Sequence, residues 1–234
     1  MDDAFDSAMH GLADRRAAEA DLASTVLRAV PVTGASVSTL GGILEKETIS
    51  STDPIAARVD ELQFDLGEGP CWDVVAAGRP IFEPEIQTRP RHRWPAFIEA
   101  IQREPVGAIF AFPLSIGTLR IGALDLYHEG PAELSDEDAR RAAAMATLIS
   151  RYVMRRALRL AGEPEPSEHR HARRVVHQAT GFVIAQLGLS PEDAYLLIQG
   201  QALAQGRTMN EIAHDIIDRR LSFTTDDGRI EEES

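Results

Sequence analysis

A short segment rich in proline and glycine, residues 161–167, divides the sequence into two parts with different patterns of apolar residues. Before it, short apolar runs alternate with segments of helical spacing, which is typical of a sheet flanked by helices. After it, apolar residues recur only at helical spacing. A chain of 234 residues is long enough for two modest domains. The break therefore predicts where one domain ends and the next begins.

The first part predicts an antiparallel sheet with helices around it. Residues 35–40 alternate like a half-buried strand, and two apolar runs, 106–116 and 119–127, are separated by a turn, which indicates a hairpin. Asp53 followed by proline indicates the start of a helix. Residues 5–28 have the spacing of a single amphipathic lead-in helix.

A long helix is predicted from a capping box at Ser135 to about Leu160. Apolar and small residues recur along it at alternating spacings of three and four, which is a short heptad pattern. Two interpretations are open: a dimeric coiled coil, or one helix face packed on the sheet of its own domain. The heptad positions are Ala139, Ala142, Ala146, Ile149, Val153, Arg156 and Leu160.

Three amphipathic helices are predicted after residue 167, and together they make a compact bundle. The first covers about 168–187, and the next two begin at capping boxes on Ser190 and Thr208. The residues that follow are polar and acidic, which predicts a disordered tail. The predicted fold class is α+β, with boundaries at 1–160 for the sheet domain and its helices, 161–167 for the linker, 168–223 for the bundle and 224–234 for the tail.

Charge and cysteine content limit the possible functions. The formal net charge is −13, and residues 163–234 hold 7 Arg, no Lys and 13 acids, so any nucleic-acid surface must be a local patch of Arg and His. A single cysteine, Cys71, excludes an internal disulfide and a zinc site of four cysteines. The acidic start has no leader pattern and no apolar run reaches the length of a membrane span, so we expect a cytoplasmic protein without membrane contact.

Several motifs in the first part resemble the GAF domains of bacterial regulators. They are Gly67-Glu68-Gly69-Pro70-Cys71, Arg93-Trp94-Pro95, Phe112-Pro113-Leu114 and Ile121-Gly122-Ala123-Leu124-Asp125-Leu126-Tyr127. The resemblance covers about residues 20–155. It implies a sensor domain with a central antiparallel sheet, an unidentified small-molecule ligand on one face, and helices that often dimerise.

The second part resembles the ANTAR domain of transcription antitermination regulators over about residues 168–222. The matching segments are Arg174-Val175-Val176-His177-Gln178-Ala179-Thr180-Gly181, Leu189-Ser190-Pro191-Glu192-Asp193-Ala194-Tyr195 and Arg207-Thr208-Met209-Asn210-Glu211-Ile212-Ala213. The resemblance implies a homodimer that binds paired stem-loops in leader transcripts and prevents a terminator hairpin from forming. The family usually carries a Lys at the position of Thr180 and basic residues at those of Gln199, Gly200 and Leu203.

Candidate site residues follow from these patterns. For RNA binding they are Arg170, Arg173, Arg174, His177, Thr180 and Arg207, of which the first four share one helix face. For a ligand pocket they are Phe64, Phe82, Phe110, Phe112 and Tyr127, with core packing as the alternative. Cys71 at a helix start is a candidate redox thiol, with a buried apolar role as the alternative. No metal cluster and no identified cofactor are expected.

Three hypotheses of function remain open. The first is a signal-responsive regulator that binds leader RNA through its C-terminal bundle. The second is a dimeric adaptor whose bundle does not bind RNA. The third is a DNA-binding protein, which the acidic Glu211, Asp215 and Asp218 of the last helix disfavour. An enzyme is not expected, because one cysteine cannot complete the disulfide cycle of GAF-fold methionine sulfoxide reductases.

Overall fold

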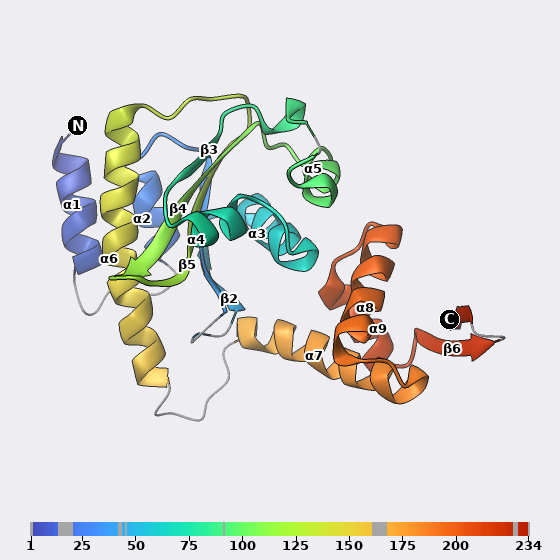
Figure 1. The fold of residues 1–234 in the computed structure, drawn as a ribbon. Helices are drawn as coiled ribbons and strands as arrows, with labels where there is room; N and C mark the ends of the chain where they lie inside the picture. The colour runs from blue at the N-terminus through green and yellow to red at the C-terminus, as the bar shows by residue number, and fades with distance from the viewer. Residues whose placement is uncertain are drawn as a thin grey trace. The chain divides into compact units, whose positions relative to one another are not determined.

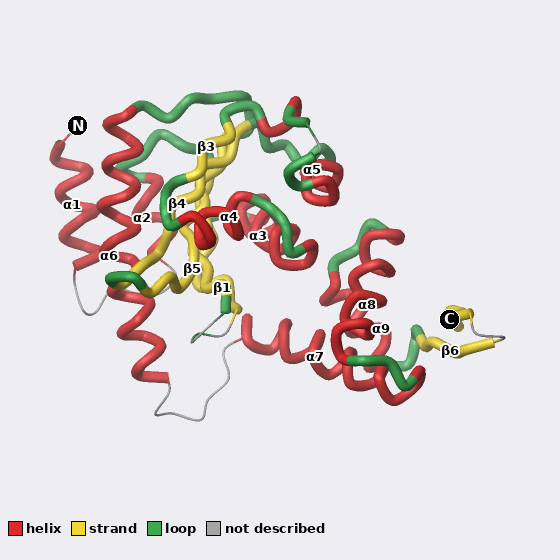
Figure 2. Tube along the Cα trace, in the orientation of Figure 1, coloured by secondary structure: helices red, strands yellow, loops and turns green. Residues whose placement is uncertain are grey.

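The chain divides into two compact units, Met1–Glu165 and Pro166–Ser234. The structure, a computed structural model, describes residues 2–13, 21–41, 44, 46–90, 92–160, 168–226 and 229–233. The N-terminal unit combines a sheet with helices, and the C-terminal unit is mainly helical, as Figure 2 shows. The predicted linker 161–167 lies outside the described residues. The α+β fold class expected from the sequence is confirmed.

The N-terminal unit is built on a five-stranded antiparallel sheet in the order β2-β1-β5-β4-β3. The predicted hairpin is present as β4 (Ala108–Ile116) and β5 (Leu119–His128), and β1 (Gly34–Leu40) pairs with β5. The edges are β3 (Ile81–Glu83) and β2 (Lys46–Ser51). Strand β2 was missed from the sequence because two of its buried residues, Glu47 and Ser50, are polar.

Helices cover both faces of this sheet (Figure 1). On one face lie α1 (Asp2–Ala13), α2 (Asp21–Leu27) and α6 (Asp136–Leu160). On the other lie α3 (Pro54–Leu66), α4 (Pro70–Ala77) and α5 (Pro95–Ile101), with the short 3-10 helix η1 (Ile86–Thr88) beside α5. Each layer encloses its own hydrophobic core. The prediction of one continuous lead-in helix was wrong, since α1 and α2 are separate helices.

The heptad positions of α6 face the sheet of the same unit. Ala142, Ala146, Ile149 and Val153 are all buried in the core between α6 and the sheet. Arg156, the next position, is also buried, and its guanidinium donates two hydrogen bonds of 2.9 Å to the carboxylate of Glu47 on β2. Side chains that are already packed inside one domain cannot form the seam of a coiled coil. The second interpretation of the pattern is therefore correct, and a coiled coil through this seam is wrong.

The C-terminal unit packs three helices around one apolar core. They are α7 (Glu168–Leu187), α8 (Pro191–Gln205) and α9 (Met209–Ile217). Ser190 accepts a hydrogen bond from the backbone of Asp193, and Thr208 and Glu211 form the predicted capping box of α9. Gly206 closes α8 in the left-handed region at φ 64°.

The end of the chain differs from the expected disordered tail. Strands β6 (Ser222–Asp226) and β7 (Arg229–Glu233) pair as an antiparallel hairpin. Phe223 is buried in the core of the unit, and its backbone amide donates to the side-chain oxygen of Gln186. The acidic composition of this segment predicted disorder. The contacts of one buried aromatic residue, Phe223, nevertheless hold the strand against α7.

Candidate functional site

The Gly67-Glu68-Gly69-Pro70 turn joins three helices of the N-terminal unit. Gly67 ends α3 in the left-handed region at φ 63°, and Pro70 opens α4. Between them, the carboxylate of Glu68 accepts hydrogen bonds from the backbone amides of Ala96 and Phe97 at the start of α5. A motif noticed as a family signature thus has a structural role, which is to fix α3, α4 and α5 against one another.

Gly69 is required by a close approach of Gln63. Its φ is 127°, and a Cβ at this position would lie 2.7 Å from the Cγ and Oε1 atoms of Gln63. Gln63 is fully buried, and its Oε1 accepts a 2.7 Å hydrogen bond from the backbone amide of Cys71. Its Nε2 donates to Asp125 on β5 at 2.8 Å. One amide side chain therefore links α3, the start of α4 and the centre of the sheet.

Asp125 is a buried carboxyl group with an unusual pKa. Its pKa is raised to about 8, mainly by burial and also by the neighbouring Asp60 carboxylate, while the hydrogen bond from Gln63 opposes the rise. Asp60 on α3 is also buried and accepts a hydrogen bond from Thr48. At neutral pH Asp125 is therefore mainly protonated. Neither carboxyl group was singled out from the sequence, because isolated acids in a strand and a helix carry no local signal of burial.

The five aromatic residues proposed as a pocket do not line one cavity. Phe110 and Phe112 are buried on the α6 side of the sheet, and Phe82 lies against both rings with 45% of its surface exposed. Phe64 and Tyr127 belong to the core on the opposite face. The Tyr127 hydroxyl donates to Asp53, the cap of α3, and burial together with that bond raises its pKa. Four of these side chains are core residues on two different faces of the sheet, and Phe82 is partly exposed, so the five do not line one pocket.

Cys71 is fully buried within the α3–α4–α5 core. A thiol that senses oxidants must be reachable from solvent. The position of Cys71 fits the alternative reading of the sequence, a small apolar side chain next to the helix start that Gln63 holds.

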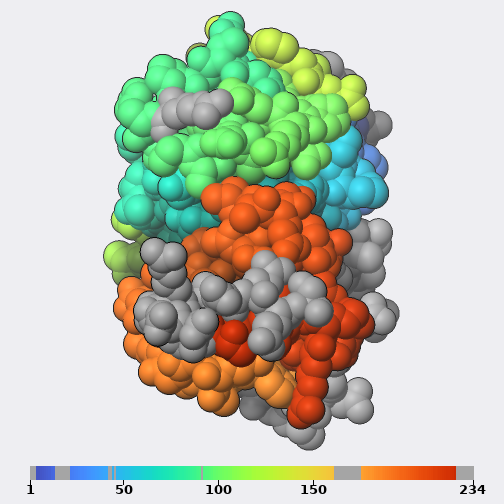
Figure 3. Space-filling view, turned by 90° about the vertical axis from the view of Figure 1, so that its right-hand side faces the viewer, coloured from blue at the N-terminus to red at the C-terminus, as the bar shows by residue number. Residues whose placement is uncertain are grey.

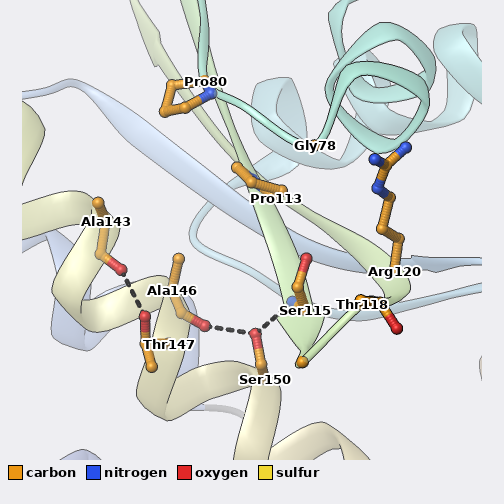
Figure 4. Close-up of a pocket in the computed structure, with 11 residues that line it drawn as sticks. Gly78, Pro80, Pro113, Ser115, Thr118, Arg120, Ala143, Ala146, Thr147 and Ser150 are labelled. Atoms are coloured by element: carbon orange, nitrogen blue, oxygen red, sulfur yellow. Dashed lines mark hydrogen bonds between the residues drawn. The ribbon is translucent and has the colours of Figure 1, made fainter.

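A pocket of about 480 Å³ lies on the other side of the sheet, between the β4–β5 turn and α6 (Figure 4). Ser150 of α6 accepts a hydrogen bond from the backbone amide of Ser115 and donates to Ala146, and Thr147 donates to Ala143. Arg120 at the rim donates to the carbonyl oxygens at the end of α4. The size suits a small molecule, and the walls belong to both the sheet and the long helix.

Among the RNA-binding candidates, the structure separates exposed side chains from internal ones. His177 on α7 is exposed, whereas Thr180 is buried and its hydroxyl donates to the carbonyl of Val176 in its own helix. Arg207 is half-exposed and forms an ion pair of 2.7 Å with Asp215. The burial of Thr180 and the internal bond of its hydroxyl argue against an RNA contact by this side chain. The side chains of Arg170, Arg173 and Arg174 lie outside the described part of the chain, although their backbone is helical.

The C-terminal unit, orange and red in Figure 3, exposes both charged and apolar side chains. Asp215 accepts hydrogen bonds from Arg220 and Arg207, which lower its pKa. Leu196 and Leu203 on α8 are 53% and 47% exposed, and Gly200 lies between them on that helix. The positions that the ANTAR family usually fills with basic residues are therefore neutral and partly apolar here.

Three arginines of α6 were missed from the sequence. Arg151, Arg155 and Arg159 are all exposed, four residues apart. The heptad pattern drew attention to the opposite face of the helix, yet the spacing of four was itself a visible signal.

In the described part of the chain, no group of His, Cys, Asp and Glu is arranged to hold a metal ion. None of the described helices is both long and apolar enough to pass through a membrane.

Comparison with known proteins agrees with both halves of this description. The GAF domain family matches residues 17–154, and the ANTAR domain family matches residues 167–217. The GAF domain of a phosphoenolpyruvate-protein phosphotransferase from Coxiella burnetii has a similar structure, with a TM-score of 0.53 at 17% identity over 67% of this chain and 96% of that one. A free methionine-R-sulfoxide reductase from Neisseria meningitidis matches with a TM-score of 0.49 and 17% identity, over 67% of this chain and 89% of that one. A comparison with curated protein sequences found no significant match.

The fold and the two matches define a regulatory protein with a sensor-type domain and a helical output domain. The chain belongs to the GAF domain family and carries an ANTAR domain, which makes it a regulator of the antitermination family.

Proposed function

We propose that the protein is a homodimeric regulator that binds stem-loops in leader transcripts through its C-terminal helices and prevents terminator hairpins under control of the N-terminal unit. The observation that carries the proposal is the ANTAR domain at 167–217, joined in one chain to a GAF domain at 17–154. One cysteine cannot complete the disulfide cycle of GAF-fold methionine sulfoxide reductases, so we propose a function without enzymatic turnover.

The outer face of α7 supports RNA contact. Val175, Ala179 and Val183 form the buried stripe of this helix, and His177 lies on the opposite face. Helical spacing assigns positions 170, 173 and 174 to the same face as His177, where arginines would meet phosphates and bases. Gly181, one turn beyond His177, is exposed, and a Cβ there would meet no described atom within 4 Å. That leaves open space for a nucleic-acid backbone.

Signal control fits the pocket beside α6. A small molecule in the pocket of Figure 4 would contact Ser115 and Thr118 near the β4–β5 turn and Thr147 on α6. Because α6 is the last helix before residues 161–167, a ligand that shifts it would change how two C-terminal units are presented in a dimer. Two linked binding units raise the effective concentration, so such a change alters avidity without new contacts.

A mobility-shift titration with an RNA of two tandem stem-loops tests the proposal. The full chain should bind, with an affinity that falls steeply as salt rises, and Arg173→Ala/Arg174→Ala should bind more weakly with a flatter salt slope. The control is Arg79→Ala/Arg103→Ala, which removes two exposed arginines of the N-terminal unit and the same net charge. Failure of the wild-type chain to bind stem-loop RNA over this salt range would overturn the proposal.

A second candidate is favoured by the surface of α8. Leu203 presents an apolar group where RNA-binding relatives usually carry a cation, and Leu196 is a second exposed leucine on the same helix. Arg207 is neutralised by Asp215. An adaptor that uses this surface for protein contacts would bind no RNA. In sedimentation experiments, Leu196→Asp/Leu203→Asp would then weaken its self-association or partner binding.

A further inference from the structure

Helix α6 contains both buried and exposed arginines. From Ala139 to Leu160 it contains six arginines and no acidic residue, and the exposed Arg140 donates a hydrogen bond to the carbonyl oxygen of Asp136. The two buried ones are neutralised: Arg141 pairs with Glu137, and Arg156 pairs with Glu47. Arg151, Arg155 and Arg159 are exposed, and none of the three forms an ion pair with an acidic residue in the described part of the chain.

The three exposed arginines form one stripe along the helix. Residues four apart lie on the same side, about 6 Å apart along the axis. Like charges at this spacing destabilise a helix. The helix dipole stabilises positive charges only in the last turn of a helix. It can therefore stabilise Arg159, but not Arg151, which lies more than two turns from the C-terminal residue Leu160. On a chain with a net charge of −13, an uncompensated cationic stripe indicates an anionic partner outside the unit.

A hollow beside the stripe indicates which kind of anionic partner would fit there. Its described lining consists of Tyr152, Arg155, Leu158 and Arg159, and its volume is about 370 Å³. Leu158 is 69% exposed and gives the hollow an apolar wall between the charged groups. Flat bases stack on guanidinium planes and cover apolar side chains, while their phosphates meet the charges. An acidic peptide would satisfy the arginines but would need an aromatic side chain at this one position, whereas every nucleotide carries a flat base next to its phosphate.

We infer that the Arg151–Arg155–Arg159 stripe is a second RNA contact, which binds single-stranded nucleotides next to the stem-loops held by the C-terminal unit. The inference rests on the proposed function, since it assumes that the chain binds RNA. The arginines contact phosphates, and the hollow at Leu158 takes one unstacked base.

The test uses the full chain and an RNA of two tandem stem-loops followed by a single-stranded extension of about ten nucleotides. The variant is Arg151→Gln/Arg155→Gln/Arg159→Gln, and the control is Arg28→Gln/Arg79→Gln/Arg103→Gln. The control arginines are exposed and lie elsewhere on the N-terminal unit, so both variants lose the same charge. The stripe variant should bind up to roughly 100-fold more weakly than the control at 0.1 M salt, with a salt slope flatter by about 2, because three lost contacts each contribute about 0.7. A 4-thiouridine in the extension should crosslink to the 151–159 segment.

The outcomes separate the two proposals. If the wild type and both variants bind equally well and no crosslink maps to α6, the stripe is not an RNA contact, while the proposed function stands. If the wild type does not bind RNA at all, both fall. If the stripe variant binds RNA more tightly than the control, the three arginines oppose RNA binding, and the inference is overturned. Loss of binding only in the stripe variant, together with the crosslink, supports it.

Discussion

The two units differ in what they bury. Apart from Thr180, every buried polar or charged side chain in the described residues belongs to the N-terminal unit. There, Gln63, Asp125 and the Glu47–Arg156 pair link elements that are far apart in the sequence. The C-terminal unit instead packs aliphatic side chains between helices with capped ends. Buried polar contacts specify one arrangement at a cost, whereas apolar packing of capped helices follows from local pattern.

Breaking the buried ion pair should give the largest effect. Arg156→Ala leaves the Glu47 carboxylate buried without its main partner, so we expect a loss of about 3–5 kcal/mol in the unfolding free energy of the N-terminal unit. Both tryptophans, Trp72 and Trp94, lie in this unit, so urea denaturation followed by tryptophan fluorescence reports on it alone.

The matched control for Arg156 is its neighbour on the outer face. Arg155→Ala should change the unfolding free energy by no more than about 0.5 kcal/mol, because this side chain is exposed. The double change Glu47→Leu/Arg156→Met should recover most of the lost stability, because it removes both charges together. Equal losses in the Arg156 and Arg155 variants would show that burial of the pair does not govern the stability of this unit.

The same contrast explains how far the sequence predicts the fold. Capping residues such as Ser190 and Thr208 and the helical spacing between them predict the C-terminal helices within a residue or two. The hairpin of β4 and β5 is equally visible as two apolar runs around a turn. Strand β2 cannot be recognised from the local sequence, because its buried Glu47 is stabilised by Arg156, which lies 109 residues away in the chain.

The candidate sites were harder to predict than the fold. Five aromatic residues were assigned to one pocket from residue type alone, although strand alternation places Tyr127 on the opposite face of the sheet from Phe110 and Phe112. Thr180 was proposed as an RNA contact because the ANTAR family usually carries a Lys at its position. In the structure its hydroxyl donates to the carbonyl oxygen of Val176 in its own helix. The exposed arginines of α6 could have been found from their spacing of four, once the opposite face was assigned to the sheet.

The buried Asp125 should make the stability of the N-terminal unit depend on pH. In the unfolded chain its pKa is near 3.8, and in the folded unit it is about 8, so between these values the folded state binds more protons. This contribution to stability is complete below the lower value and is lost as the pH rises through the higher one. We expect wild-type stability to fall between pH 5 and 8, by at most about 1.4 kcal/mol per pH unit.

The test of this pH dependence is Asp125→Asn, which keeps an oxygen for Gln63 but cannot ionise. Urea denaturation monitored by tryptophan fluorescence at pH 5.5, 6.5 and 8 should show a flatter profile than that of the wild type. The control Glu129→Gln, at an exposed carboxylate just after β5, should keep the wild-type slope. An unchanged slope in Asp125→Asn would mean that this carboxyl group ionises without penalty inside the core.

The smallest expected effect concerns two glycines of the C-terminal unit. Gly181 on α7 and Gly200 on α8 are both exposed within helices, and a Cβ at either position meets no described atom within 4 Å. Close packing of another helix is therefore not the reason for a glycine at position 181. Because glycine disfavours a helix relative to alanine, Gly181→Ala and Gly200→Ala should each stabilise the unit by about 1 kcal/mol, measured by circular dichroism. The two variants should then differ in function: only Gly181→Ala, on the His177 face, should weaken binding to tandem stem-loop RNA, since the added methyl group holds the RNA backbone away from the helix. Equal RNA affinity in both variants would move the interface from α7 to another face of the unit.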